Sequence, residues 1–368
     1  MTRRFDLLMM RAALALARRG LGTVWPNPAV GAIVVKGDRV LGRGWTGKGG
    51  RPHAETEALG RAGEAARGAT LYVSLEPCCH WGETPPCTEA IIAAGIGRVV
   101  CALEDPDPRV KSGGMRRLRE AGIALEEGLC AEEAAEVNAG FLSRMTRGRP
   151  LVTLKLATSL DGRIATRSGE SRWITGDLAR ERAHLLRASH DAVLVGTGTV
   201  LADDPLLTCR LPGLADRSPV RVALDRRLEI PLSARIVADA RAHPIWLLAS
   251  RQADARRREA LVEGGIEVVE IEGESADGLD LGAALRALAA RGITRLLIEG
   301  GARLAASLLK ARLADRLAWF HAPLVIGGDG EPALAELGID ALADAPAFEP
   351  ISVEAVGEDV LTALRARA

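Results

Sequence analysis

The chain has 368 residues, more than one hydrophobic core usually organises, so we expect two domains of about 150–200 residues each. Its 48 basic residues balance its 48 acidic residues, which excludes a general electrostatic attraction to nucleic acid or to an anionic membrane. Aromatic residues make up only 3%, which argues against a stacking platform for single-stranded nucleic acid.

The N-terminal segment begins with basic residues, as a signal peptide does, but Asp6 and Arg11 interrupt its apolar residues. Its spacing instead predicts an amphipathic helix over about residues 5–19. The sequence contains no apolar run of the length that spans a bilayer. We therefore expect a cytoplasmic, reducing location, where clustered cysteines indicate metal binding or catalysis before disulfides.

The first half of the chain alternates between strand and helix patterns. Its expected elements, after the first helix, are strands at 29–35, 39–45, 69–75 and 98–103, and helices from Pro52, at 84–95 and at 113–122. The first two strands should form a hairpin that turns at Lys36-Gly37-Asp38. Thr84 is the predicted N-cap of its helix, and Gly95 is the predicted terminator.

A domain boundary is expected within residues 144–152, because helical periodicity stops at Gly148 and Pro150 and a β-rich pattern begins. We therefore predict one domain over 1–146 and a second over 150–368. The expected elements of the second are strands at 152–158, 192–196, 220–225, 244–250, 266–272, 295–301 and 317–327, helices at 177–189 and 302–312, and a hairpin around Gly357. Strand–helix alternation in both halves predicts two α/β domains, each with a partly parallel sheet.

Three of the six cysteines fall in one stretch, LEPCCHWGETPPC (75–87), shortly after the His53-Ala54-Glu55 sequence. An imidazole from His53 and thiolates from Cys78 and Cys87 would supply three donors for a tetrahedral zinc, with the fourth position open to water. Glu55 would then stand beside that water and carry its proton. His-x-Glu followed by Pro-Cys is the pattern of zinc deaminases, although here eight residues rather than two separate the cysteines.

The main alternative is a structural zinc site, with Cys79 or His80 completing four protein ligands, but it leaves Glu55 without a role. Spacing alone leaves the choice between Cys78 and Cys79 open. The remaining cysteines, Cys101, Cys130 and Cys209, are interpreted as small apolar residues. The other histidines, which have no partner in the sequence and are expected to be structural or exposed, are His184, His190, His243 and His321.

The segments PHAE, LEPC, HWGETPPC and PNPAVGAIVV (26–35) together resemble the deaminase half of the bacterial bifunctional riboflavin-biosynthesis deaminase/reductase, over most of residues 5–145. The resemblance implies a cytidine-deaminase-like α/β/α domain in which Glu55 is the proton donor and acceptor. It also implies that Asn27 and His80 contact the pyrimidine or its ribose phosphate. The zinc ligands that it implies are His53, Cys78 and Cys87.

Three residues depart from the pattern of that family: Thr46, Glu83 and Asp107. Thr46 stands in place of a histidine, Glu83 in place of a basic residue, and Asp107 in place of an asparagine. An acid beside a phosphate is unfavourable, so we expect the phosphate contacts to come from Lys48, Arg51 or Lys111.

In the second half, GTGTVLADDP fails the dinucleotide-binding fingerprint, which requires glycine where Leu201 stands. A phosphate cradle is instead suggested at residues 296–309, where a buried strand ends in Glu299-Gly300-Gly301 and runs into a helix.

The segments at 154–175, 194–210 and 298–304 resemble the reductase half of the same bifunctional family, which has a dihydrofolate-reductase-like α/β fold and uses NADPH. The NADPH contacts implied by the resemblance are Ala157, Trp173, Thr199, Asp203, Gly301, Ala302, Arg303, Leu304, Ala305, Ala306 and Ser307. The implied substrate contacts are Ser171, Arg187, Leu207, Arg210 and Glu299. Reduction of the ribosylamine requires its sugar ring to open. The ionisable groups that could assist this opening and the movement of protons are Lys155, Asp203 and Glu299. The alternative to a functional role is a helix or turn cap for Asp203 and a place on a solvated helix face for Arg187.

We therefore predict a zinc- and NADPH-dependent bifunctional enzyme of riboflavin biosynthesis that acts on a small pyrimidine ribose-phosphate, binds neither nucleic acid nor membrane, and forms a homo-oligomer. The rival interpretations are a nucleoside or nucleic-acid deaminase with an unrelated reductase, a zinc-stabilised binding module, and an enzyme whose deaminase half is impaired by Thr46, Glu83 and Asp107.

Overall fold

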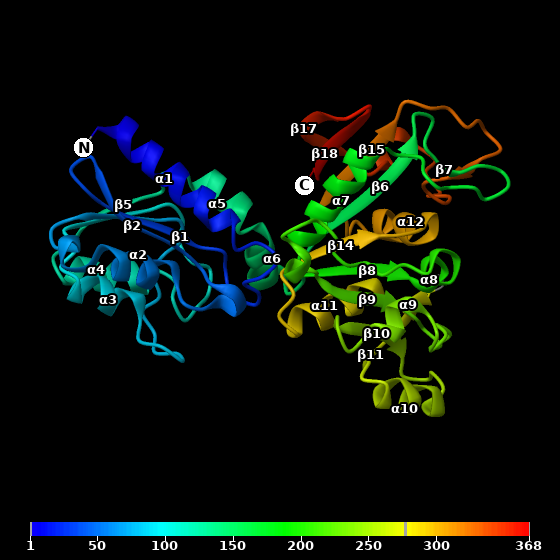
Figure 1. Cartoon of the computed structure of the whole chain (residues 1–368), viewed down its shortest axis with the longest axis horizontal. Coiled ribbons are helices and arrows are strands. Elements are labelled where there is room, and N and C mark those ends of the chain that lie inside the picture. The colour runs from blue at the N-terminus through cyan, green and yellow to red at the C-terminus, as the bar shows by residue number, and fades with distance from the viewer. Residues whose placement is uncertain (1, 276–277, 368) are drawn as a thin grey trace. The chain divides into compact units, whose positions relative to one another are not determined.

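The computed structural model describes residues 2–275 and 278–367, and the chain divides into an N-terminal unit (1–148) and a C-terminal unit (149–368). The division falls within the segment 144–152, where the sequence analysis expects a boundary. Both units are α/β, as predicted (Figure 1). In the described part of the chain, no helix combines the length and the apolar character that crossing a membrane requires.

The N-terminal unit is built on a five-stranded sheet with the order β2-β1-β3-β4-β5, in which β1 is antiparallel to β2 and β3 while β3, β4 and β5 are parallel. Its strands are β1 (Gly31–Lys36), β2 (Arg39–Trp45), β3 (Thr70–Val73), β4 (Arg98–Cys101) and β5 (Ala124–Glu127). Its α-helices are α1 (Arg3–Arg18), α2 (Ala54–Ala62), α3 (Cys87–Ala93), α4 (Gly113–Glu120), α5 (Ala131–Val137) and α6 (Ala139–Arg147). Short 3-10 turns, η1 (Lys48–Gly50) and η2 (Gly63–Ala66), flank α2.

Helices α1 and α5 cover one face of this sheet, and α2, α3 and α4 cover the other (Figure 1). Strand residues alternate between the two cores, as the two-residue period of a strand requires. Ile33 and Tyr72 pack with α1, whereas Val34 and Leu71 pack with α2. The result is a three-layer α/β/α arrangement.

The predicted hairpin between β1 and β2 is confirmed, but the predicted N-cap Thr84 is wrong. Helix α3 begins at Cys87 after an extended Pro86, and no side chain caps it. The hydroxyl of Thr84 instead accepts a hydrogen bond from Arg51. Gly95 does follow the helix as predicted, with a φ of 68° that suits glycine.

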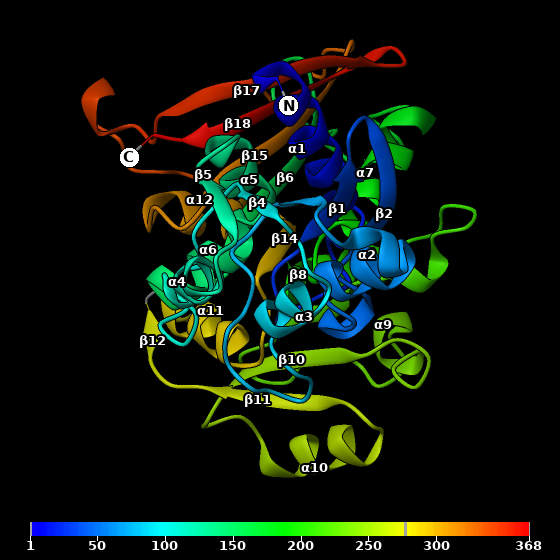
Figure 2. The same cartoon turned by 90° about the vertical axis from the view of Figure 1, so that its left-hand side faces the viewer.

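The C-terminal unit contains a nine-stranded sheet with the order β11-β10-β9-β8-β14-β6-β15-β18-β17. The strands from β11 to β15 in this order are parallel, and β18 and β17 add an antiparallel hairpin that turns at Gly357, as predicted. Strands β17 and β11 form its two edges (Figure 2).

The strands of this sheet are β6 (Leu151–Ser159), β8 (Ala192–Gly196), β9 (Val220–Leu224), β10 (Ile245–Ser250), β11 (Glu267–Ile271), β14 (Arg295–Glu299), β15 (Arg316–Ala322), β17 (Phe348–Val356) and β18 (Asp359–Ala366). Two small ribbons pair β7 (Arg163–Ala165) with β16 (Glu331–Pro332) and β12 (Glu274–Ser275) with β13 (Gly278–Leu279). The helices are α7 (Asp177–Ala188), α8 (Thr197–Asp203), α9 (Arg235–Ala238), α10 (Ala255–Glu263), α11 (Leu281–Ala290) and α12 (Ala302–Lys310), with 3-10 turns η3 (Ala215–Arg217) and η4 (Leu342–Asp344).

The central strands of this sheet end at the segments that the sequence analysis singles out. Strand β8 runs directly into α8, and β14 reaches α12 through Gly300-Gly301. The carboxyl ends of parallel strands are where α/β sheets usually bind ligands. The fold thus gathers these glycine-containing turns at one edge of the sheet.

Helix α1 packs so closely on β1 that Gly31 has room for hydrogen only, since an added Cβ would lie 1.9 Å from the Ala13 carbonyl oxygen. We predict that Gly31→Ala lowers the free energy of unfolding of the N-terminal unit by about 1–3 kcal/mol, because helix and strand must separate. Denaturant titration measures this change.

Gly60→Ala is the matched control, because Gly60 lies within α2 and a Cβ there meets no atom within 4 Å. It should raise the free energy of unfolding by about 0.5–1 kcal/mol through its better helix propensity. Equal effects of the two substitutions would contradict the close approach of α1 and β1.

Candidate functional site

The structure brings His53, Cys78 and Cys87 together from three separate segments. His53 immediately precedes α2, Cys78 lies in the loop after β3, and Cys87 is the first residue of α3. Their donor atoms all lie within 4.8 Å of one another, with His53 Nδ1 3.2 Å from Cys87 Sγ and 3.6 Å from Cys78 Sγ. An imidazole and two thiols in this arrangement are a donor set suited to zinc.

The two thiols of this cluster influence each other's protonation. A hydrogen bond from the Cys87 thiol, together with His53, lowers the pKa of Cys78 to about 4, while Cys78 and burial raise the pKa of Cys87. The backbone N–H of Cys87 also donates to Cys78 Sγ at 3.3 Å. A thiolate at Cys78 is therefore stabilised by the protein itself, as a metal ligand requires.

Neither Cys79 nor His80 joins this cluster. Cys79 Sγ lies 3.8 Å and 3.9 Å from the carbonyl oxygens of Arg109 and Val110 and is not part of the group of donor atoms around His53. His80 Nδ1 is buried and has no hydrogen-bond partner among the described residues. Spacing alone could not choose between Cys78 and Cys79, and the structure places only Cys78 in the cluster. The structural zinc site with four protein ligands therefore lacks its fourth donor among the described residues.

Glu55 lies in the first turn of α2, two residues after His53, and is 4% exposed. Its carboxyl group shares a hydrogen bond with the Cys87 thiol. Burial raises the pKa of Glu55 to about 7. The helix thus holds a carboxyl group against the cluster without adding it to the three donors.

Asn27 lies against the turn that leads into His53. Its side-chain N–H donates to the Gly49 carbonyl at 3.5 Å, and an added Cβ on Gly50 would lie 1.8 Å from Asn27 Nδ2. Glycine is favoured at this position both by the close approach of Asn27 and by the φ of 90°. An amide group at this turn and the unpartnered ring nitrogen of His80 are suited to contacting a bound molecule.

The three departures from the family pattern have structural partners. Thr46 is buried, and its hydroxyl accepts a hydrogen bond from the Val30 N–H at 2.9 Å. Glu83 forms an ion pair with Arg51 at 3.0 Å, and Asp107 forms one with Arg109. Arg51, one of the three expected phosphate contacts, is therefore already engaged by an acid.

Glu76 was not among the site residues predicted from the sequence. It fixes the loop that leads into Cys78. Its buried carboxylate accepts hydrogen bonds from the N–H groups of four residues at 2.9–3.3 Å: Asp105, Ser112, Gly114 and Met115. An added Cβ on Gly114 would lie 2.0 Å from the Pro77 carbonyl oxygen. Because Glu76 immediately precedes Pro77-Cys78, these bonds tie the start of α4 to the cysteine loop.

The C-terminal unit has a cleft of about 2100 Å³, and almost every residue predicted for its site lines it. The exception is Ala305, which is fully buried within α12. The two glycine-containing turns meet here, since the Gly301 N–H donates to Thr199 Oγ1 at 3.4 Å. Segments far apart in the sequence thus form one site.

The charged centre of the cleft is an ion pair between Arg187 and Glu299, which are 13% and 11% exposed. Arg187 Nε and Nη2 donate to the two carboxylate oxygens at 2.6 Å and 2.8 Å, and Nη1 donates to the Thr208 carbonyl at 3.0 Å. Strand pairing places Lys155 directly beside Glu299. The solvated helix face considered for Arg187 is therefore wrong.

Burial and opposite charges act against each other in this centre. Burial alone would raise the pKa of Glu299, but Arg187 and Lys155 bring it down to about 2. Burial lowers the pKa of Lys155. His184, interpreted from the sequence as structural or exposed, also lines the cleft, and burial together with Arg187 and Arg210 lowers its pKa to about 4.

Asp203 ends helix α8, and its neighbour Asp204 occupies the C-cap position with a φ of 43°. Asp203 is exposed at the cleft, and its carbonyl oxygen accepts a hydrogen bond from Arg172 at 3.2 Å. The turn cap considered for Asp203 is thus occupied by the next residue.

Comparisons with known proteins match both units. Residues 150–362 match the family described as RibD C-terminal domain, and residues 3–103 match the cytidine and deoxycytidylate deaminase zinc-binding region. The chain is 44% identical to the riboflavin biosynthesis protein RibD of Bacillus amyloliquefaciens over 96% of this chain and 95% of that protein.

Two solved structures are similar over 99% of both chains. One is RibD of Acinetobacter baumannii, with a TM-score of 0.90 and 38% identity. The other is a diaminohydroxyphosphoribosylaminopyrimidine deaminase/5-amino-6-(5-phosphoribosylamino)uracil reductase of Thermotoga maritima, with a TM-score of 0.87 and 36% identity.

We predict that Glu76→Gln lowers the free energy of unfolding of the N-terminal unit by about 3 kcal/mol, because a neutral amide offers one acceptor oxygen to four N–H groups, three of which are buried. Denaturant titration provides the measurement. Glu89→Gln is the control, since Glu89 pairs with Arg117 on the surface and should cost about 0.5 kcal/mol or less. Indistinguishable effects of the two variants would refute the anchoring role of Glu76.

Proposed function

Because the chain belongs to the RibD family of riboflavin biosynthesis proteins, we propose a role for each of its two sites from this premise. The protein is a bifunctional enzyme of riboflavin biosynthesis, with a zinc-binding deaminase domain and an NADPH-using reductase domain. Its deaminase domain is cytidine-deaminase-like and its second domain is of the RibD reductase type.

The proposed substrate of the N-terminal domain, 1–146, is 2,5-diamino-6-ribosylamino-4(3H)-pyrimidinone 5′-phosphate. Water replaces the C2 amino group, and ammonia leaves. The domain 150–368 then reduces the ribosyl group of the product to ribityl with NADPH, which gives 5-amino-6-ribitylamino-uracil 5′-phosphate. The names carried by the Thermotoga maritima relative support this pair of consecutive reactions.

In the deaminase site, His53, Cys78 and Cys87 would hold the zinc ion, which supplies Lewis acidity toward water at neutral pH. Glu55 takes one proton from the attacking water and delivers it to the ring nitrogen. It then takes the proton of the new C2 hydroxyl group and delivers it to the departing amine, which leaves as ammonia. Asn27 and His80 orient the pyrimidine and its ribose phosphate. The observation that carries this assignment is the convergence of three zinc-type donors beside a buried carboxyl group that is not one of them.

In the reductase site, the bound NADPH would supply the hydride that C1 of the ring-opened sugar imine accepts. The proposed NADPH contacts are Ala157, Trp173, Thr199, Asp203 and residues 301–307. Lys155, Asp203 and Glu299 assist ring opening and proton movement, and Ser171 and Leu207 contact the substrate. Because Glu299 already engages Arg187, we assign the phosphate chiefly to Arg210, which is exposed at the cleft, while Arg187 holds Glu299 in place.

The partner of both sites is a small molecule. We further propose a cytoplasmic location, supported by six cysteines that form no disulfide. A homo-oligomer is proposed as well. It is supported by the edge strand β17, where Ile351 and Val353 are 49% and 66% exposed.

We predict that the purified chain with zinc, incubated with the diaminopyrimidine phosphate, produces a mass gain of about one unit without NADPH and a further gain of about two units with it. These gains correspond to replacement of NH by O and to addition of hydride and a proton. Mass spectrometry separates the two half-reactions. Absence of the first gain, with reduction retained when the deaminated substrate is supplied directly, would indicate the impaired deaminase considered for Thr46, Glu83 and Asp107.

Glu55→Gln should keep the zinc content and the reductase activity while deamination falls by a factor of about 10²–10⁴, since the proton carrier is lost. Glu57→Gln is the control on the same helix, because Glu57 pairs with Arg61 at the surface and should leave both activities unchanged. Retained deamination in Glu55→Gln would contradict the assigned role.

A further inference from the structure

The segment from Asp204 to Arg210 forms one wall of the reductase cleft in an unusual backbone conformation. Asp204 and Leu207 both have positive φ angles, 43° and 57°, although neither is glycine. Leu207 is also 3% exposed, and it lines the cleft together with Arg210. Residues in this conformation persist only where surrounding contacts fix them.

The cleft side of this segment is fixed by the site itself. The Thr208 carbonyl accepts a hydrogen bond from Arg187, and the Arg210 N–H donates to His184 Nδ1 at 3.4 Å. Arg187, which holds Glu299 in place, and His184 are therefore both bonded to the same short segment.

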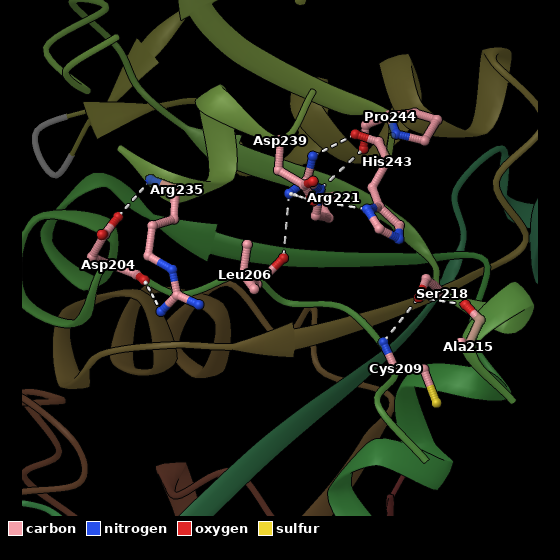
Figure 3. A network of polar contacts seen from close by, with 10 residues as sticks. All are labelled: Asp204, Leu206, Cys209, Ala215, Ser218, Arg221, Arg235, Asp239, His243 and Pro244. Carbon is pink, nitrogen blue, oxygen red and sulfur yellow. Dashed lines mark hydrogen bonds and ion pairs between the residues drawn. The ribbon is translucent and has the colours of Figure 1, made fainter. Parts of the chain in front are cut away.

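A second set of contacts, which Figure 3 shows, also fixes this segment. The Arg235 N–H donates to Asp204 Oδ1 at 2.7 Å, and the Cys209 N–H donates to Ser218 Oγ at 3.1 Å. Between these two anchors, Arg221 Nη1 donates to the Leu206 carbonyl at 3.4 Å. This last contact holds the peptide that immediately precedes Leu207.

Arg221 lies on β9 and is 0% exposed, so its guanidinium depends wholly on protein partners. It donates to the carbonyl oxygens of His243 and Pro244, and its Nη1 is also 3.3 Å from Asp239 Oδ2 (Figure 3). The same carboxylate oxygen accepts a hydrogen bond from His243 Nδ1 at 2.7 Å. A single nitrogen of Arg221 thus joins the cleft wall to a counter-charge, Asp239, that is 31% exposed.

We propose that Arg221 is a positioning residue for the reduction: it holds the Leu206 peptide so that Leu207 and Arg210 meet the pyrimidine ribose-phosphate. The inference rests on the proposed function of this cleft. It assigns a task to a buried cation outside the set of residues predicted to contact substrate or NADPH. The guanidinium fork suits this task, because its fixed N–H directions define the positions of several carbonyl groups at once.

The test compares the full-length wild-type enzyme with Arg221→Met/Asp239→Asn. This variant removes the buried charge of Arg221 together with the charge of its partly exposed partner Asp239, so neither is left uncompensated. The reductase KM for the deaminated substrate should rise about tenfold, with a smaller change in kcat, because the lost bonds position substrate contacts rather than reacting atoms. The deaminase activity of the same preparation should stay unchanged.

Arg149→Met/Asp315→Asn is the matched control, because it removes another largely buried Arg–Asp pair of the same unit, and neither residue lines the cleft. It should lower stability without the KM effect. An unchanged KM in the folded Arg221 variant, or equal KM changes in both variants, would overturn the inference.

If Arg221→Met/Asp239→Asn does not fold, the single variant Asp239→Asn provides the test. A rise in reductase KM of less than tenfold, with normal deamination, supports the inference. A wild-type KM overturns it. A wild-type enzyme that fails to oxidise NADPH with the deaminated substrate would instead refute the proposed function, so the two failures are distinguishable.

Discussion

The N-terminal unit depends on holding one imidazole and two thiols from three separate segments within 4.8 Å of one another. The parallel pair β3 and β4 fixes the loop that carries Cys78, while α2 and α3 begin next to it and supply His53 and Cys87. Both helices present their N-terminal ends, where the helix dipole favours negatively charged sulfur. Glu76 then ties this loop to the start of α4, so the cluster rests on backbone that is fixed on two sides.

In the C-terminal unit, charged side chains from separate elements converge at one carboxylate, that of Glu299. Strand register places Lys155 beside Glu299, and Arg187 reaches the same carboxylate from α7. The ion pair leaves Arg210 as an exposed cation at the cleft wall. Arg210 lies on a segment that is anchored by Arg187, His184, Arg221, Arg235 and Ser218. In both units predicted site residues lie on segments whose backbone groups are bound by a buried charged side chain, Glu76 in the first unit and Arg221 in the second.

Sequence patterns predicted what is local, namely the alternating strands and helices, the two hairpins and the motif residues around His53 and Glu299. The family that the motifs indicate is confirmed, since relatives match both halves of the chain. This match contradicts two rival interpretations, a deaminase with an unrelated reductase and a binding module. The sequence misplaced the start of α3, because Thr84 bonds to distant Arg51 rather than to its own helix. Glu76 and Arg221 were missed for a related reason: their partners are largely backbone groups at distant positions, which leave no side-chain pattern to find.

We propose that the zinc ion has three protein donors and keeps one position for solvent. X-ray absorption spectroscopy at the zinc edge of the purified, active enzyme measures this directly. The account predicts one zinc per N-terminal unit bound by one imidazole nitrogen, two sulfurs and one further light atom that exchanges with solvent. A third sulfur, a fully protein-bound coordination sphere, or an active enzyme without zinc would contradict it.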